Sequence, residues 1–236
     1  MSSERCWGII PAAGIGARVG GERPKQYQQI AGATLLEYSL GVLLACDWIE
    51  QVVVALHPHD RYAGDLACFK KERVATVTGG AERMDSVMAG LAALALRAAE
   101  NDWVLVHDAA RPCLRVEDVQ HLCEFVRSSG TGAILAEPVV DTVKRVGPNH
   151  RVLETVDRSA LWRAQTPQMF RLGELHDALK LAKEQAFTVT DEASAMENAG
   201  RSVHLVPGSA SNIKVTVAED LALARWYLEH QLRGAG

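Results

Sequence analysis

The sequence has no close pair of cysteines and no long apolar run. Its five cysteines are dispersed along 236 residues, and none forms a Cys-x-x-Cys pair. A dispersed, odd set is more typical of free thiols in a reducing compartment than of a disulfide framework. No stretch approaches the roughly 18 apolar residues that would span a bilayer, and the N-terminus does not have the layout of a signal peptide. We therefore expect a cytoplasmic protein with no membrane partner.

Positive charge is not in excess either. The chain has 25 Lys and Arg against 29 Asp and Glu, so its formal net charge is −4. This balance gives no support to a nucleic-acid partner, and any anionic ligand must be held by a few locally placed cations. The hydrophobic content of 48% is ordinary for a globular protein. The length favours one α/β domain over residues 1–236, with an excursion from it.

The first loop lacks both of the common phosphate-binding patterns. Residues 11–26 read PAAGIGARVGGERPKQ and follow an apolar run at 6–10. Small residues after a strand expose backbone N–H groups to an anion. However, the dinucleotide fingerprint needs a third glycine where Val19 stands, and the Walker triplet Gly-Lys-Ser/Thr occurs nowhere. A phosphate bound here would be held in another way, with Arg18, Arg23 and Lys25 as the nearby cations.

Short apolar runs alternate with helical patterns along the chain. Strands are expected at 6–10, 51–55, 73–78, 103–106, 132–136 and 203–207. Helices are expected at 34–45, 84–98, 116–128, 172–184, 191–198 and the C-terminus. Thr34 with Glu37, and Thr216 with Glu219, have the spacing of capping boxes. The alternation predicts an α/β, Rossmann-like fold with a mostly parallel sheet flanked by helices.

The alternation loosens over residues 138–161, where valines alternate around Gly147-Pro148. This is typical of a hairpin with a short loop, and we expect a projecting β-arm rather than a second domain. An isolated hairpin is marginal in water, so the arm should pack against something. We expect two arms to clasp about a two-fold axis in a homodimer, which would bury their apolar faces. The valines of that face are Val139, Val143, Val146, Val152 and Val156.

Three expected strands end in small residues next to charged ones. The segments are 12–25, 78–83 (Thr-Gly-Gly-Ala-Glu-Arg) and 107–112 (His-Asp-Ala-Ala-Arg-Pro). In open parallel sheets, ligands bind beyond the carboxyl ends of the strands. Cations beside one carboxylate suit a magnesium nucleotide, because the cations neutralise phosphates and the acid can bind Mg²⁺.

Each of these residues also has a purely structural interpretation. Lys25 could be a solvated surface lysine, and Asp108 could cap the following helix with Arg111 as its local partner. His107 is best interpreted as a buried or capping histidine. A metal site at His57 and His59 is not indicated, because no acidic or cysteine cluster is near them in sequence.

The first loop resembles the signature of nucleotidyltransferases that make activated sugars and polyols. The complete set of motifs is similar to the 2-C-methyl-D-erythritol 4-phosphate cytidylyltransferase family of the non-mevalonate isoprenoid pathway. The other motifs are GGAERMDSV, VLVHDAARP, DTVKR, VDRSALWRAQTPQ, TDEASA and NIKVT, and the resemblance runs from Ile9 to about Trp226. It implies transfer of CMP from CTP to methylerythritol phosphate, which gives 4-diphosphocytidyl-2-C-methyl-D-erythritol and pyrophosphate.

The resemblance also implies roles for individual residues. Catalytic roles fall on Arg18 and Lys25, which would stabilise the transition state, and on Arg158 and Lys214, which would position the methylerythritol phosphate. The nucleotide would be held by Ala12, Ala13, Gly14, Gly80 and Ser86, with Ser86 and backbone groups reading cytosine. The polyol side would be lined by Asp108, Arg111, Thr142 and Thr166. Mg²⁺ would be required, held mainly through CTP phosphates with Asp108 as a candidate ligand, and the arm would carry Arg158 and Thr142 to the neighbouring site of a homodimer.

Two alternatives remain open at this stage. A cytidylyltransferase for ribitol 5-phosphate or another polyol phosphate shares several elements, but it tends to lack the Pro-Ala-Ala-Gly opening and the Thr-Asp-Glu-Ala-Ser run found here. A nucleotide-binding regulator that has lost catalysis would normally have lost a catalytic charge, whereas all four are retained. One position departs from the family: Ala81 stands where an acidic residue is common, and we expect a minor effect.

Overall fold

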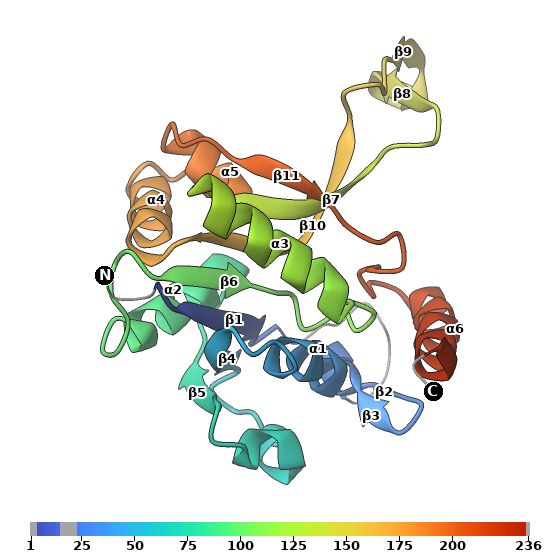
Figure 1. Ribbon diagram of the computed structural model, residues 1–236. Coiled ribbons are helices and arrows are strands. Elements are labelled where there is room, and N and C mark those ends of the chain that lie inside the picture. The colour runs from blue at the N-terminus through green and yellow to red at the C-terminus, as the bar shows by residue number, and fades with distance from the viewer. Residues whose placement is uncertain (1–3, 15–22, 235–236) are drawn as a thin grey trace.

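The structure, a computed structural model, describes residues 4–14 and 23–234, with side chains described up to Gln231. Arg18 therefore lies outside the described residues. A seven-stranded sheet with the order β11-β7-β10-β6-β1-β4-β5 forms the centre (Figure 1). Its strands are β1 (Cys6–Ala12), β4 (Ile49–Leu56), β5 (Val74–Thr78), β6 (Trp103–Val106), β7 (Ala133–Pro138), β10 (Trp162–Arg171) and β11 (His204–Pro207). A small separate pair, β2 (Gln29–Ile30) and β3 (Ala33–Thr34), precedes the first helix.

Most neighbouring strands in this sheet run parallel, which confirms the predicted α/β class. The exception is β10, which runs antiparallel to both β6 and β7. Since β10 enters the sheet at the edge where β6 ends, its first residues lie beside the chain that follows β6. Gln168 pairs with Val106, so Gln165 and Thr166 extend beyond the carboxyl end of β6. This strand was not predicted from the sequence, although it completes the carboxyl edge of the sheet beside β6.

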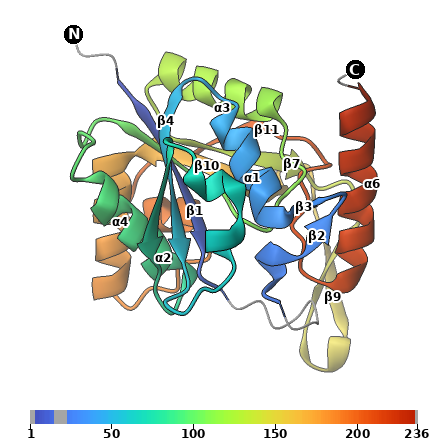
Figure 2. The same cartoon turned by 90° about the horizontal axis from the view of Figure 1, so that it is seen from below.

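Helices cover both faces of the sheet (Figure 2). Helices α1 (Leu35–Leu44) and α3 (Val116–Ser129) pack on one apolar cluster, and α2 (Arg83–Leu94), α4 (Leu172–Glu184) and α5 (Glu192–Asn198) pack on another. The strands supply both clusters because successive side chains point to opposite faces: Ile10 belongs to the first and Ile9 to the second. Helix α6 (Ala218–Gly234) covers a third cluster that includes Ile30 and Val215.

One predicted capping box is confirmed and the other is wrong. Thr34 and Glu37 exchange hydrogen bonds at the start of α1, as predicted. At the start of α6, Thr216 pairs with Asp220 rather than Glu219: its backbone N and its Oγ1 lie 2.7 and 2.8 Å from Asp220 Oδ2. The helix begins only at Ala218, so the carboxylate that faces Thr216 comes one residue later than the capping-box spacing assumes.

The predicted arm is present as a hairpin. Strands β8 (Val143–Val146) and β9 (Val152–Val156) form an antiparallel pair of their own, joined by a short 3₁₀ turn at Pro148–His150, and project from the main sheet between β7 and β10 (Figure 1). Val140, Val146, Val152 and Leu153 are each more than half exposed within the single chain. The arm thus presents apolar surface away from the sheet. Within the part of the chain that is described, no helix is long and apolar enough to cross a membrane.

Candidate active site

Two adjacent pockets lie at the carboxyl edge of the sheet, where β1, β5 and β6 end and β10 begins. The first pocket is lined by Ala12, Ala13 and Gly14 after β1, by Gly80 and Ser86 after β5, by Asp108 after β6, and by Lys25 and Lys214. The second shares Arg83, Asp108 and Lys214 with the first and adds Arg111, Gln165, Thr166, Gln168 and Asp191. The two pockets therefore meet at one carboxylate, Asp108.

The turn after β1 is held from within by a buried amide. The side-chain Nε2 of Gln26 donates to the carbonyl oxygens of Ala12, at 2.8 Å, and Gly14, at 3.1 Å. Lys25 precedes Gln26 at the start of a 3₁₀ turn, and its Nζ lies 3.2 Å from the carbonyl oxygen of Val215. This contact places the ammonium of Lys25 beside the segment that carries Lys214.

The turn after β5 depends on two glycines. A Cβ on Gly79 would lie 2.6 Å from the Cβ of Ala13, and one on Gly80 would lie 2.2 Å from the Cβ of Asp85. Both distances are shorter than real side chains tolerate, so only glycine lets this turn approach the β1 turn and helix α2. Ser86 fixes the turn: its Oγ accepts from Gly80 N–H at 3.2 Å and donates to the carbonyl oxygen of Glu82 at 3.3 Å.

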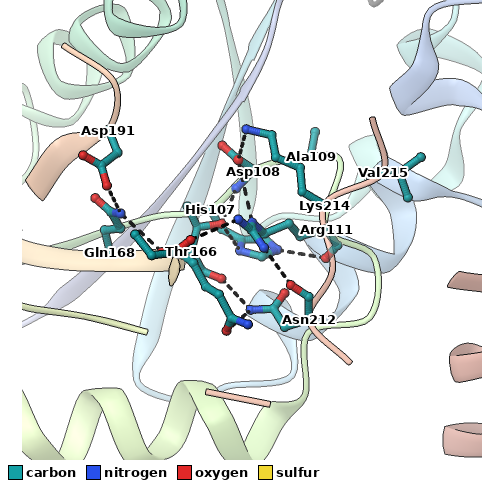
Figure 3. A network of polar contacts seen from close by, with 12 residues as sticks. His107, Asp108, Ala109, Arg111, Thr166, Gln168, Asp191, Asn212, Lys214 and Val215 are labelled. Carbon is teal, nitrogen blue, oxygen red and sulfur yellow. Dashed lines mark hydrogen bonds and ion pairs between the residues drawn. The ribbon is translucent and has the colours of Figure 1, made fainter. Parts of the chain in front are cut away.

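Asp108 lies among three cationic side chains. Two of them, Lys214 and Arg111, are labelled beside it in Figure 3. Its Oδ1 accepts from Arg83 Nε at 2.9 Å and its Oδ2 from Lys214 Nζ at 2.8 Å, while Arg111 Nε lies 3.8 Å from Oδ2. Burial by itself would raise the pKa of this carboxyl, but the charges of Arg83 and Lys214 outweigh burial and hold the pKa well below its usual range. Asp108 is therefore ionised, and it orients the cations around it.

Backbone contacts fix Arg111 at the second pocket. Its Nη1 donates to the carbonyl oxygen of Asn212 at 2.7 Å. Asn212 is fully buried, and its amide donates in turn to the carbonyl oxygen of Thr166 at 2.8 Å. The Thr166 hydroxyl accepts the backbone N–H of Asp108 at 3.0 Å. Strand β10, the chain after β6 and the segment before α6 are thus joined into one wall (Figure 3).

The most extensively paired charges of the site, those of Arg83 and Glu192, were not predicted from the sequence. The Nη1 and Nη2 atoms of Arg83 lie 2.6 and 2.9 Å from the two carboxylate oxygens of Glu192, which is fully buried. Burial would lower the pKa of the guanidinium, but Glu192 and Asp108 together raise the pKa of Arg83 above its ordinary value. A signal was available, because both residues are charged positions inside two of the motifs, GGAERMDSV and TDEASA.

Two predicted residues do not join the site within one chain. Thr142 and Arg158 lie exposed on the arm, where Arg158 Nη1 donates to the carbonyl oxygen of Val140. Neither lines either pocket. All other predicted site residues that fall within the described ranges do line one pocket or the other.

The side chains of the two pockets suit Mg²⁺ only if the ion is coordinated mainly by the phosphates of a bound substrate. Over residues 4–14 and 23–234, no three His, Cys, Asp or Glu side chains group closely enough to form a metal cage. The first pocket does have carboxylates, those of Asp108 and Glu82. One or two carboxylates together with substrate phosphates are a common way for proteins to hold Mg²⁺.

Comparisons with known proteins give one consistent family. The family model for 2-C-methyl-D-erythritol 4-phosphate cytidylyltransferase matches residues 7–230. A protein of that name from Vibrio vulnificus (strain CMCP6) is 50% identical over 223 residues, covering 94% of each chain. Another, from Pseudoalteromonas atlantica, is 51% identical over 223 residues, covering 94% of this chain and 95% of its own.

Solved structures agree with the sequence comparisons. A crystal structure of 4-diphosphocytidyl-2C-methyl-D-erythritol synthase superimposes with a TM-score of 0.82 at 38% identity, covering 96% of this chain and 99% of its own. The 2-C-methyl-D-erythritol 4-phosphate cytidylyltransferase of Francisella tularensis gives a TM-score of 0.80 at 36% identity, covering 94% and 99% of the two chains.

Proposed function

The chain belongs to the 2-C-methyl-D-erythritol 4-phosphate cytidylyltransferase family, and from this premise we propose how its site carries out the family's reaction. The reaction transfers CMP from CTP to 2-C-methyl-D-erythritol 4-phosphate, giving 4-diphosphocytidyl-2-C-methyl-D-erythritol and pyrophosphate, in non-mevalonate isoprenoid biosynthesis. The comparisons do not favour the alternative of a ribitol 5-phosphate cytidylyltransferase, because the family model and the relatives all bear the methylerythritol name.

The observation that carries this proposal is the meeting of two pockets at Asp108. CTP occupies the first pocket, over the small residues of the β1 and β5 turns, where the backbone can approach a nucleotide closely. The polyol phosphate occupies the second pocket, beside Arg111 and Thr166. Lys214 lines both pockets, so its ammonium lies where the attacking phosphate and the α-phosphate of CTP come together.

The reaction requires stabilisation of negative charge and does not require a covalent protein nucleophile. A phosphate oxygen of the polyol phosphate attacks the α-phosphorus of CTP, and pyrophosphate leaves. Negative charge then gathers on the five-coordinate phosphorus, so fixed cations lower the barrier by positioning and electrostatics. Lys25 supplies such a charge in the lining of the nucleotide pocket, and the family resemblance assigns the same task to Arg18.

Mg²⁺ completes the proposed site, coordinated mainly by CTP phosphate oxygens with Asp108 as the candidate protein ligand. Bound there, the ion would neutralise part of the triphosphate charge. Ser86 and backbone groups of the β5 turn face the cytosine end of the pocket. The Ser86 hydroxyl already donates to Glu82, but its oxygen retains acceptor capacity.

We assign the arm to a homodimer in which each arm serves the other subunit's site. Its apolar side chains are exposed in the single chain, and an isolated hairpin is marginal in water, so a second copy is the natural surface to cover it. Arg158 and Thr142 lie on this arm and away from both pockets of their own chain. They would therefore act in trans, with Arg158 helping Lys214 to position the methylerythritol phosphate.

The direct test is pyrophosphate release with CTP and each candidate polyol phosphate in turn, in the presence and absence of Mg²⁺. Release with methylerythritol phosphate, little release with ribitol 5-phosphate, and loss on chelation of the metal are expected. Release with neither phosphate would contradict the proposal.

A further inference from the structure

Glu192 is an acidic side chain that is fully buried beside the site but lines neither pocket. It is the first residue of α5, its exposed fraction is 0%, and it belongs to the lining of neither pocket. Its two oxygens are both engaged by the Nη atoms of Arg83, at 2.6 and 2.9 Å. A carboxylate in this position cannot touch a ligand, so any part it plays in the reaction must pass through Arg83.

The pairing determines which edge of the Arg83 guanidinium faces Asp108. Each Nη atom donates to one oxygen of Glu192, and the contact to Asp108 Oδ1 is made from the side of the guanidinium by Nε, at 2.9 Å. A planar guanidinium can also grip one carboxylate with two parallel N–H groups. With Glu192 holding the edge formed by Nη1 and Nη2, Arg83 cannot turn that edge to Asp108. Asp108 Oδ2 is left to Lys214, whose Nζ lies 2.8 Å away.

We propose that Glu192 is a positioning residue for Lys214, which it orients through Arg83 and Asp108. This inference rests on the proposed function, since it is the polyol phosphate that Lys214 would contact. The path consists of three consecutive contacts between charged groups, from Glu192 to Arg83, from Arg83 to Asp108, and from Asp108 to Lys214. It links the start of α5 to the start of α2, and then the chain after β6 to the segment before α6.

A positioning role and a purely electrostatic role of Glu192 predict opposite effects on phosphate binding when its carboxylate is removed. Arg83, Arg111 and Lys214 carry three positive charges against the negative charges of Asp108 and Glu192. Replacing Glu192 by a neutral residue makes the site more positive, which by electrostatics alone would tighten the binding of an anionic phosphate. If Glu192 positions Lys214, the same change weakens that binding, because Arg83 is released to compete for Asp108.

The first test is Glu192→Gln, with KM for the polyol phosphate, KM for CTP and kcat measured from pyrophosphate release at a temperature well below the Tm. The proposal predicts a KM for the polyol phosphate raised about fivefold or more, with KM for CTP within about twofold of wild type. An unchanged or lowered KM for the polyol phosphate would overturn it, and so would an equal rise in both KM values. Glu174→Gln is the matched control, since Glu174 pairs with Arg201 at the surface, and it should behave as wild type.

A second variant keeps the test decisive if Glu192→Gln does not fold, because breaking a buried ion pair on one side is strongly destabilising. Glu192→Asp keeps the charge and shortens the side chain by one methylene, so the ion pair with Arg83 is weakened rather than removed and the variant is expected to fold. The proposal predicts for it a raised KM for the polyol phosphate with KM for CTP near that of wild type, whereas a wild-type KM for the polyol phosphate would overturn it.

Failure of the proposed function is recognised separately, because wild-type protein would then release no pyrophosphate from CTP and methylerythritol phosphate. In that event, calorimetric titration with inorganic phosphate replaces turnover. Weaker phosphate binding by Glu192→Gln than by wild type would support the positioning role, and equal or tighter binding would overturn it.

Discussion

Thr166 and His107 are joined by a hydrogen bond whose direction the surrounding contacts determine. Thr166 Oγ1 lies 3.0 Å from His107 Nδ1 and also accepts the backbone N–H of Asp108 at 3.0 Å. The carbonyl oxygen of Arg111, which can only accept, lies 3.2 Å from Nε2, so Nε2 carries the ring hydrogen. Burial lowers the pKa of His107 and keeps the ring neutral, so Nδ1 is unprotonated and accepts from the Thr166 hydroxyl. A neutral His107 thus holds both ends of the loop that carries Asp108 and Arg111 (Figure 3).

The burial of His107 predicts a pH-dependent stability. Its exposed fraction is 0%, and burial lowers its pKa from 6.5 to about 4. Between these values the unfolded chain binds the proton and the folded chain does not, so the contribution is present above about pH 6.5 and is lost as pH falls towards 4. A shift of this size corresponds to about 3 kcal/mol in the free energy of unfolding.

Urea unfolding at several pH values between 4 and 7 measures this effect in wild type and in His107→Gln. Wild type should lose more of its free energy of unfolding across this range than the variant does. Since the other titrating groups are common to both proteins, the difference in slope isolates His107. Parallel curves would show that the pKa of His107 is not lowered by folding.

Lys25→Ala should lower kcat by about a hundredfold or more without unfolding the protein. The side chain is only partly buried, and its loss removes a cation from the lining of the proposed nucleotide pocket. The measurement is pyrophosphate release under saturating substrates, with the Tm recorded alongside. Lys180→Ala removes an exposed lysine on α4 and should leave kcat unchanged. A near-normal kcat for Lys25→Ala would remove Lys25 from the catalytic residues.

Ser86→Ala should weaken discrimination between CTP and UTP. The change removes the oxygen that accepts from Gly80 N–H and holds the carbonyl of Glu82, so the turn that faces the base loses its fixed shape. The ratio of kcat/KM for the two nucleotides is expected to fall about fivefold or more. Ser128→Ala, which removes a hydroxyl bonded to the Phe125 carbonyl on the surface, is the control. An unchanged ratio would place base recognition on backbone groups alone.

If each arm serves the partner's site, two inactive variants should complement each other in a mixed dimer. If Arg158 acts in trans, a heterodimer of Lys25→Ala and Arg158→Ala subunits has one site with both defects and one site with neither. Random exchange of equal amounts makes half of the dimers mixed, so about a quarter of wild-type activity should return. Each variant exchanged with itself should stay inactive. Mixed dimers seen by mass measurement without any return of activity would show that Arg158 serves its own subunit.

Much of the fold could be predicted because it follows from local patterns. Apolar runs of strand length alternate with helical spacing, and the Thr34–Glu37 capping box is a contact between residues three apart. Strand β10 was missed because its direction depends on its neighbours β6 and β7, which lie far away in the sequence. The cap of α6 was misassigned because the capping-box spacing assumes a helix start that the chain does not use; α6 begins at Ala218.

The site could be predicted in its strand-end residues but not in its pairings. Turns of small residues beside charge mark the ends of β1, β5 and β6 directly in the sequence. The contact between Arg83 and Glu192 joins residues 109 positions apart, and a local sequence pattern does not show which residues meet across such a separation. The same holds for Gln26, which sequence reasoning passed over although it supports the β1 turn by hydrogen bonds to Ala12 and Gly14.

The most direct measurement of the central claim is a competition in one vessel. CTP, Mg²⁺ and the protein are mixed with equal concentrations of 2-C-methyl-D-erythritol 4-phosphate and ribitol 5-phosphate, and the cytidine diphosphate products are separated and identified by mass. The ratio of products reports the ratio of kcat/KM values, which is the proper measure of specificity. We expect 4-diphosphocytidyl-2-C-methyl-D-erythritol as the dominant product, by about a hundredfold or more. A dominant ribitol product, or no cytidylylated product at all, would contradict it.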